Sequence, residues 1–427
     1  MKFKREVLGN GIRLISCYLP NLKNSVSFQI GVGVGTRQEA PRHKGLAHFV
    51  EHMAFKGTKR FPGAVQLVEK FGKTGADFNA WTDREYTKFT VDSSPEYINE
   101  SLNLLLDVFF HPNFRTRDLN IERNVIVSEH WDGLDDSNEL VGNLYNQITF
   151  GGEHPLGWPV EGNTRSILEI GRNDLQRFHQ HYYLGGTNNI VATLSGNFSS
   201  KIFGNLRRYL AKIPAKTASL KSVKYESRQN RPRLLLREIN TRQAYFCLGF
   251  RAYRHRHPKT LELEVIDSLL SDGWSSRLWL EIREKLGFVY GIESGWSALT
   301  DCGTFDISGS LAPKNLPTGL KAIREELGKL CTDLVSTREF KRVQISMSES
   351  VKSNFQLPDN VCNWMFMQEL FEDKLETPQK WLERIYQVKP AAVREVAREI
   401  FRSAQLNCAV VAPRLNERKI RKALLID

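Results

Sequence analysis

The spacing of apolar residues divides the chain into segments with a two-residue repeat and longer segments with helical periodicity. In the first half, the pattern predicts strands at residues 7–16, 26–34, 76–81, 85–92 and 189–196. It predicts a short helix after the second strand, and further helices at 64–71, 95–109, 116–131, 167–182 and up to about residue 210. Asn10-Gly11, inside the first strand segment, is typical of a hairpin turn.

The second half repeats this order of elements after a segment rich in Lys, Ser and Arg, which we interpret as a linker at 214–230. Strands are predicted at 234–236, 244–250, 292–311 (a pair) and 408–412, and helices at 261–270, 317–331, 337–353, 359–370 and 390–402. We therefore predict two homologous α+β domains, 1–213 and 231–427. Each is expected to have an antiparallel-rich sheet with helices on one face.

The first predicted helix carries a metal-binding pattern. His48 and His52 are four residues apart, so on a helix both imidazoles lie on one face and can bind one metal ion. Glu51 lies on that face, close enough to take a proton from a metal-bound water without being a ligand. The order H-x-x-E-H is the inverted zinc-peptidase motif and predicts one Zn²⁺ per chain, with manganese or cobalt as alternatives.

A metal site of this kind needs a third protein ligand. Glu122 and Glu129 lie seven residues apart in a predicted helix, so they also share one face. We assign Glu129 as the ligand and Glu122 as a residue that orients a ligand by hydrogen bonding. His130 is a competing ligand, but on a helix it points about 100° away from Glu129. A histidine pair alone is equally typical of a partly exposed helix face, and the added glutamates favour the metal site.

Residues 45–58 (GLAHFVEHMAFKGT) resemble the zinc helix of the superfamily that contains pitrilysin, insulin-degrading enzyme and mitochondrial processing peptidase. The similarity is greatest to the short two-domain branch around the β subunit of the processing peptidase. Segments 75–82, 121–129 and 275–290 support the resemblance, which therefore extends over both halves of the chain. It implies an inverzincin metallopeptidase with the processing-peptidase-like metallohydrolase fold.

The same resemblance implies further site residues. Arg283 and Tyr290 match an arginine and a tyrosine that reach the scissile peptide, where a guanidinium or phenol group can stabilise an oxyanion. Without the resemblance, they are typical of a surface arginine and a core tyrosine. Asn79 and Ala80 lie where the resemblance places an edge strand to which the substrate peptide adds. We expect Trp81, the next residue, in the core.

The second half lacks the metal-binding residues. Aligning the two halves places Glu264, Asp267 and Ser268 at the positions of the H-x-x-E-H motif. No histidine remains there, so we expect no metal in the second domain. Its expected contribution is Arg283 and Tyr290.

Composition restricts the class of protein. Hydrophobic residues at 41% and charged residues at 25% are ordinary for a globular chain, and no apolar run reaches the roughly 20 residues of a membrane helix. The six cysteines are scattered and no leader-like segment opens the chain, so we expect free thiols and a cytoplasmic location. The net charge of +12 raises nucleic-acid binding as an alternative, but no recognition motif supports it. We expect neither nucleic acid nor a membrane as partner.

Together these observations predict a zinc-dependent endopeptidase in which Glu51 activates a zinc-bound water. Its expected substrates are short or unfolded polypeptides cleaved inside a chamber. The alternative is a non-catalytic scaffold or partner subunit of a processing-peptidase-like heterodimer, which the intact motif disfavours. Longer members of the superfamily build their chamber from four such domains. We therefore expect a homodimer, with a heterodimer containing a related chain as the alternative.

Overall fold

In the computed structural model, which describes residues 1–217, 222–372 and 374–425, the alternating segments of the first half form a six-stranded sheet. Its strands are β1 (Lys4–Val7), β2 (Arg13–Tyr18), β3 (Val26–Val32), β4 (Asp77–Thr82), β5 (Thr87–Ser93) and β6 (Ile190–Gly196). They lie in the order β1-β2-β6-β3-β5-β4. Neighbouring strands are antiparallel except β2 and β6, and β4 lies at an edge.

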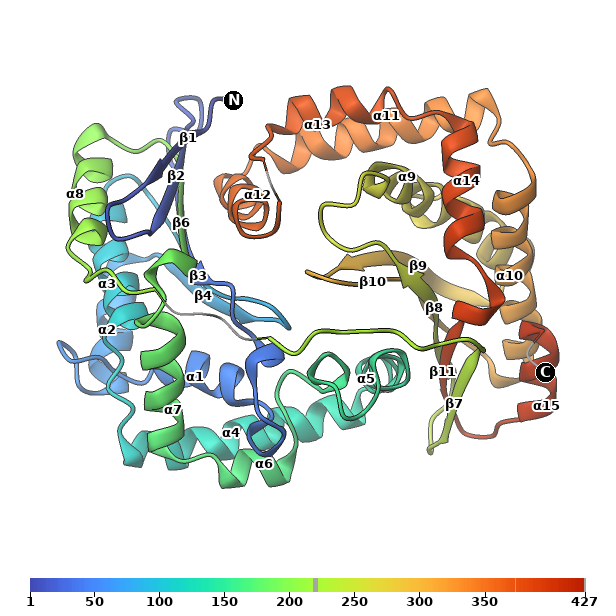
Figure 1. Ribbon diagram of the computed structural model, residues 1–427, viewed down its shortest axis with the longest axis horizontal. Coiled ribbons are helices and arrows are strands. Elements are labelled where there is room, and N and C mark those ends of the chain that lie inside the picture. Colours follow the sequence, from blue (N-terminus) through green and yellow to red (C-terminus); the bar gives the residue numbers. More distant parts are fainter. Residues whose placement is uncertain (218–221, 373, 426–427) are drawn as a thin grey trace. The chain divides into compact units, whose positions relative to one another are not determined.

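The second half forms a five-stranded sheet with the same topology (Figure 1). Its strands are β7 (Arg233–Glu238), β8 (Ala244–Ala252), β9 (Val289–Ala298), β10 (Gly303–Leu311) and β11 (Asn407–Ala412). Their order, β7-β11-β8-β10-β9, with one parallel pair, β7 and β11, matches β2-β6-β3-β5-β4 strand for strand. The predicted class, two α+β domains with antiparallel-rich sheets, is confirmed.

Compact units of the fold do not follow the two halves of the chain. Unit 1 consists of Met1–Trp131, Trp158–Val223 and Ser353–Thr377, and unit 2 of Asp132–Gly157, Lys224–Lys352 and Pro378–Asp427. Each unit therefore contains one segment from the opposite half, unlike the contiguous domains 1–213 and 231–427 expected from the sequence. Within the expected linker 214–230, residues 218–221 lie outside the described residues.

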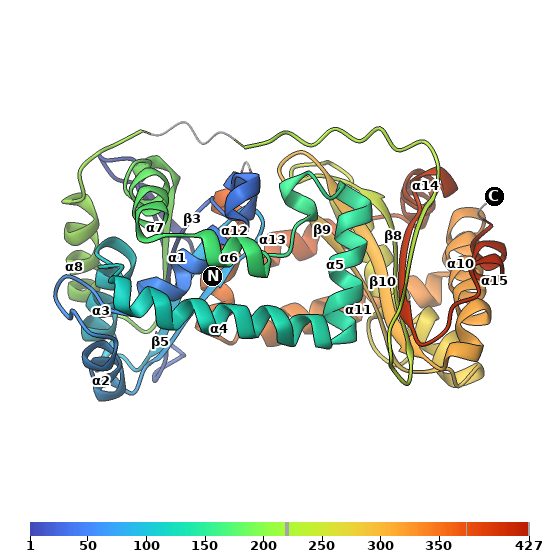
Figure 2. The ribbon, with the colours of Figure 1, turned by 90° about the horizontal axis from the view of Figure 1, so that it is seen from below.

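Most helices of each unit cover one face of its sheet. In unit 1 these are α1 (Leu46–Ala54), α2 (Ala64–Thr74), α3 (Ile98–Phe110), α4 (Thr116–Asp135), α6 (Thr164–Glu169), α7 (Arg172–Phe178) and α8 (Ser200–Ala211). Figure 2 shows α4 as one long helix, whose last residues belong to unit 2. Unit 2 contains α9 (Thr260–Ser271), α10 (Leu316–Thr332), α11 (Thr337–Asn354, its last two residues in unit 1), α13 (Pro378–Ile385), α14 (Pro390–Ile400) and α15 (Glu417–Leu424).

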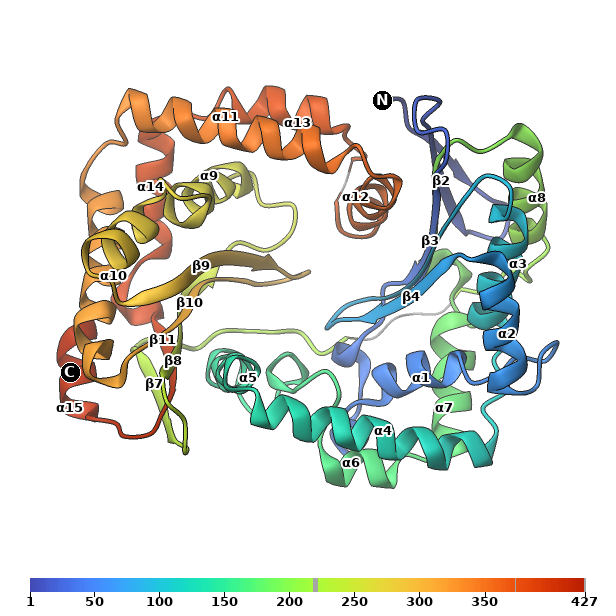
Figure 3. The same cartoon turned by 180° about the vertical axis from the view of Figure 1, so that it is seen from behind.

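The opposite face of each sheet is covered by the helix that comes from the other half of the chain. In unit 1 this helix is α12 (Pro358–Phe371), which packs on β2, β3 and β6 (Figure 3). In unit 2 it is α5 (Ser137–Phe150), which packs on β8 and β11. Glycines admit both helices, because a Cβ on Gly31 would lie 2.7 Å from Phe366 and one on Gly249 would lie 2.2 Å from Tyr145. Both faces of each central strand are therefore buried.

One predicted helix is interrupted. The prediction of a single helix over 167–182 is wrong, because the segment forms α6, α7 and a π-helical turn at His179–Tyr183. Gly171 has an extended backbone and is the N-cap of α7, with its N–H donating to the side chain of Asp174 (3.0 Å). Among the described residues, no helix combines the length and apolar character needed to cross a membrane.

Candidate metal centre

The start of α1 is fixed by a buried carboxylate. Glu39, 5% exposed, accepts hydrogen bonds from the backbone N–H groups of Gly45 (2.8 Å) and Ala47 (2.7 Å). Burial raises the pKa of Glu39 to about 8, although these backbone bonds oppose the shift. Gly45 has φ of +88° and its Cα faces the carbonyl of Glu161, so this position favours glycine. The first turn of α1 is thus held in place just before the first histidine.

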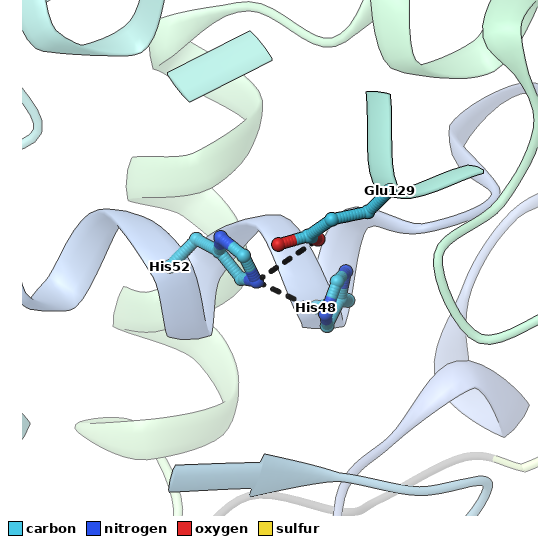
Figure 4. A group of neighbouring side chains, drawn as sticks. All are labelled: His48, His52 and Glu129. Carbon is cyan, nitrogen blue, oxygen red and sulfur yellow. Dashed lines mark hydrogen bonds and ion pairs between the residues drawn. The ribbon is translucent and has the colours of Figure 1, made fainter. Parts of the chain in front are cut away.

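Three potential ligands converge between α1 and α4. His48 Nε2 lies 3.1 Å from His52 Nε2, and His52 Nε2 lies 3.5 Å from Glu129 Oε2. One ligand atom from each residue lies within 4.8 Å of the others. Figure 4 shows the two imidazoles side by side on α1, with the Glu129 carboxylate reaching toward them from α4. The two histidines predicted on one helix and the glutamate predicted on another therefore come together, as expected from the sequence.

The hydrogen bonds around His52 determine which atoms face this point. His52 Nδ1 lies 2.9 Å from Glu122 Oε1, and because an ionised carboxylate only accepts, Nδ1 carries the proton. In the neutral ring, Nε2 then presents a lone pair toward His48 and Glu129. Burial lowers the pKa of His48 to about 3, so its imidazole is neutral at physiological pH. Nitrogen and carboxylate donors facing one another are a set that suits a zinc ion.

The charges around His52 also favour a bound cation. For His52, burial acts against the charged form, but the hydrogen bond to Glu122 and the nearby glutamate charges outweigh it and raise the pKa. The negative carboxylates that favour a proton on His52 also favour a metal cation among His48, His52 and Glu129. The residues present therefore fit zinc.

Glu51 is held by a residue that the sequence does not single out. The hydroxyl of Thr82, at the end of β4, donates to Glu51 Oε2. Burial raises the pKa of Glu51 against this hydrogen bond, and the charges of His52 and Glu129 also act on it. Glu51 therefore lies beside the three convergent side chains. Thr82 is 31 residues from Glu51 in the sequence, and no sequence motif connects the two residues.

Glu122 has a second partner. Its carboxylate, 3% exposed, binds His52 through Oε1 and Lys56 Nζ through Oε2, the latter at 2.7 Å. Burial acts to raise the pKa of Glu122, but the hydrogen bond with His52 and the contact with the Lys56 cation, together with the charges of these two side chains, outweigh it and lower the pKa. Sequence reasoning missed Lys56, although its position four residues after His52 continues the same helix face. His130 lies elsewhere, with Nδ1 3.3 Å from Glu161 Oε1.

The predicted substrate strand is at the sheet edge, as β4. Asn79 is exposed, Ala80 is half-buried, and Asn79 Oδ1 accepts the Ala80 N–H at 2.8 Å. The prediction that Trp81 belongs to the core is wrong, because its side chain is 59% exposed. Side chains alternate along a strand, and since Thr82 is turned inward toward Glu51, Trp81 must point outward.

Arg283 and Tyr290 lie together in unit 2. The Arg283 guanidinium is 4.3 Å from the ring centre of Trp279 and 5.1 Å from that of Tyr290, and it donates to the Tyr290 carbonyl. Tyr290 is 89% exposed, which excludes the alternative of a core tyrosine. Trp279 was not predicted from the sequence.

Comparisons with known proteins identify the family. Residues 19–159, which contain the whole convergent group, match the family model for insulinase, peptidase family M16. Residues 169–347, which include α9, match the model for the peptidase M16 inactive domain. The chain belongs to the M16 peptidase family.

Several M16 relatives have names that include zinc. The chain is 28% identical over 398 residues to a Bacillus subtilis protein described as uncharacterized zinc protease YmxG, covering 93% of this chain and 95% of the relative. It is 26% identical over 404 residues to an uncharacterized zinc protease of Streptomyces coelicolor, covering 93% of this chain and 87% of the relative.

Solved structures share the M16 fold. A Helicobacter pylori protease superposes with a TM-score of 0.88 at 21% identity, covering 96% of this chain and 99% of that one. The periplasmic protease PqqL of Escherichia coli gives a TM-score of 0.80 at 20% identity, with 99% of this chain matching 49% of PqqL.

Proposed function

We propose that this M16 chain is a zinc-dependent endopeptidase. The observation that supports it most is the convergence of His48, His52 and Glu129, with Glu51 beside them. These three side chains would hold one Zn²⁺ per chain. When bound, the ion would lower the pKa of a coordinated water and polarise the substrate carbonyl. The zinc protease names of the similar relatives agree with this assignment.

Glu51 is the proposed general base. Its carboxylate takes a proton from the attacking water and returns it to the amine that leaves. The Thr82 hydroxyl binds one carboxylate oxygen, which fixes the side chain and leaves the other oxygen for the proton. Glu122 holds the His52 ring from the opposite nitrogen and so keeps its Nε2 directed at the metal.

The proposed substrate binds as an added strand on β4. An extended peptide can pair with the free edge of β4, which favours short or unfolded polypeptides over folded ones. The half-buried Ala80 leaves room for a peptide backbone. Its N–H is bound by Asn79 in the absence of peptide, and a substrate carbonyl would replace Asn79 there.

Arg283 and Tyr290 are proposed as donors to the oxyanion that forms when the carbonyl is attacked. Three observations within unit 2 support this role: Tyr290 is exposed, the Arg283 guanidinium lies over the rings of Trp279 and Tyr290, and it donates to the Tyr290 backbone carbonyl. These contacts reduce the freedom of Arg283 before any substrate is present.

The proposed assembly is a homodimer in the cytoplasm, in which two copies enclose the chamber where peptides are cleaved. This chain matches only 49% of PqqL, so two copies correspond in length to that longer relative. Sedimentation of the active protein tests the proposal and should give twice 49.0 kDa. A monomer that becomes active only with a different chain would contradict it.

The proposed activity is tested by measuring zinc content and by digesting a peptide library with and without a chelator. We expect stoichiometric zinc and endoproteolytic cleavage that the chelator abolishes and zinc restores. Cleavage that survives complete removal of the metal would overturn the mechanism. Stoichiometric zinc without cleavage of any peptide would favour the non-catalytic partner subunit.

A further inference from the structure

We propose that Lys56 is a positioning residue of the metal centre. Its ammonium group holds the Glu122 carboxylate and, through it, the imidazole of His52. The inference rests on the proposed function, because it takes His52 to be a zinc ligand. It adds a third layer to the site: a ligand, the carboxylate that orients it, and the cation that orients the carboxylate.

The geometry of Glu122 carries the inference. Its two oxygens are used by two different partners, Oε1 by His52 Nδ1 at 2.9 Å and Oε2 by Lys56 Nζ at 2.7 Å. Glu122 is 3% exposed, so water cannot easily replace either partner. The hydrogen bond at Oε1 and the ion pair at Oε2 both oppose rotation of the carboxylate away from the imidazole.

Lys56 is itself held close to α1. Its backbone N–H donates to the carbonyl of Met53 (3.2 Å) and that of Phe55 donates to the carbonyl of His52 (3.3 Å), so the chain makes one tighter turn, with bonds that span three residues, after α1 ends at Ala54. His48, His52 and Lys56 follow one another at intervals of four residues, and His52 and Lys56 both reach the Glu122 carboxylate. The same segment supplies two ligands and the cation that indirectly orients one of them.

An ordinary surface ion pair would not matter in this way. Pairs between exposed charges contribute little to stability, because water screens both partners. The Lys56 side chain is 33% exposed but its partner is buried. Removing Lys56 would leave Glu122 Oε2 buried without its cation, and the carboxylate would then be free to turn toward other donors.

The test is the zinc dissociation constant, measured by competition with a chromophoric chelator. We expect Lys56→Met to weaken zinc binding by about 10-fold or more, in the range typical of residues that support metal ligands. Lys56→Arg keeps a cation in reach of Glu122 and should restore most of the affinity. The matched control is Lys352→Met, which removes an exposed lysine paired with Glu349 (2.6 Å) in unit 2 and should leave zinc affinity unchanged.

A double-mutant cycle shows whether Lys56 acts through Glu122. In the Glu122→Gln background, Lys56→Met should cause no further loss of zinc affinity. Losses that simply add would overturn the inference, as would a Lys56→Met protein that binds zinc as tightly as wild type. A wild-type protein that binds no zinc would instead overturn the proposed function.

Thermal unfolding of the metal-free proteins separates positioning from general stability. Lys56→Met should unfold within a few degrees of wild type, since the pair is local. If that variant does not fold, Lys56→Gln repeats the measurement, because it keeps a polar end of similar reach without the charge. Full zinc affinity in a folded Lys56→Gln protein would contradict the proposed role of the cation.

Discussion

Helices α1 and α9 occupy equivalent places beside two sheets of the same topology, but their polar side chains are satisfied in different ways. On α9, Asp267 accepts from Ser294 (2.5 Å) and Ser268 donates to Asp272 (3.0 Å), so neighbouring groups satisfy one another. On α1, two imidazoles face each other and a carboxylate. A shared scaffold therefore does not determine chemistry. The chemistry depends on whether electron-pair donors are left facing one another.

The largest expected effect is that of Glu51→Gln compared with Asp267→Asn. Loss of the general base should lower kcat/KM for a quenched peptide by about 10²–10⁴-fold while zinc is retained. Asp267→Asn, the same change on α9, should leave both activity and zinc content unchanged. A Glu51→Gln protein with activity close to wild type would show that α1 does not work through this carboxylate.

Metal content should separate the two glutamates of α4. Glu129→Gln is expected to lose most of the zinc, since a ligand is removed. Glu122→Gln should weaken zinc binding by about 10–100-fold, because only the support of His52 is lost. The opposite ranking, measured by elemental analysis after dialysis, would mean that the two roles are assigned the wrong way round.

Tyr290→Phe tests whether unit 2 contributes to catalysis through the Tyr290 hydroxyl on β9, given that α9 contains no histidine. Removing one oxyanion donor should lower kcat by roughly 100-fold without changing zinc content or thermal stability. The control is Tyr386→Phe, which alters another exposed tyrosine of unit 2. Wild-type kinetics for Tyr290→Phe would exclude the phenol from the mechanism.

A smaller effect is expected at Thr82. Thr82→Val removes the hydroxyl that holds Glu51 and should lower kcat by about 10-fold, the scale of one hydrogen bond to a charged group. Thr82→Ser should restore activity because the donor returns. Ser294→Ala removes the corresponding donor from Asp267 and should not change kcat.

The smallest expected effect concerns the pH dependence of stability. Burial raises the pKa of Asp267 to about 6 from its usual 3.8, so its contribution to folding is fully present below pH 3.8. That contribution is lost as pH rises through about 6, by roughly 1–3 kcal/mol. Asp267→Asn should therefore become more stable relative to wild type between pH 4 and 6, as followed by urea unfolding. A constant difference across this range would contradict the raised pKa.

Local spacing was enough to predict the arrangement within α1 and within α4. The four-residue interval of His48 and His52 and the seven-residue interval of Glu122 and Glu129 are properties of any helix. The approach of Glu129 to the histidines was expected because a metal needs a third ligand, and the structure brings them together. Thr82 was missed because its contact with Glu51 depends on how β4 packs against α1.

The burial of the second face of each sheet could not be predicted for a similar reason. In β3, Phe28 and Ile30 alternate with Ser27 and Gln29, a pattern typical of a sheet with one polar face toward water. The structure buries all four, and Gln29 Nε2 donates to the carbonyl of Asp359 in α12 (3.0 Å). Since α12 lies more than 300 residues further along the chain, alternation within β3 contains no information about it.

The exchange of α5 and α12 also affects how the protein is made. During translation, the strands β2, β3 and β6 have all left the ribosome long before residues 358–371 emerge to cover them. Until then Gln29 would lack its partner on α12, and the apolar side chains of Ile15 and Val191 would be uncovered. Neither half of the chain contains all the segments of one unit. A nascent or truncated first half would therefore expose the apolar sheet face that α12 covers, and this face would be prone to aggregation. Such a fragment would need either a chaperone or the complementary fragment to reach its native structure.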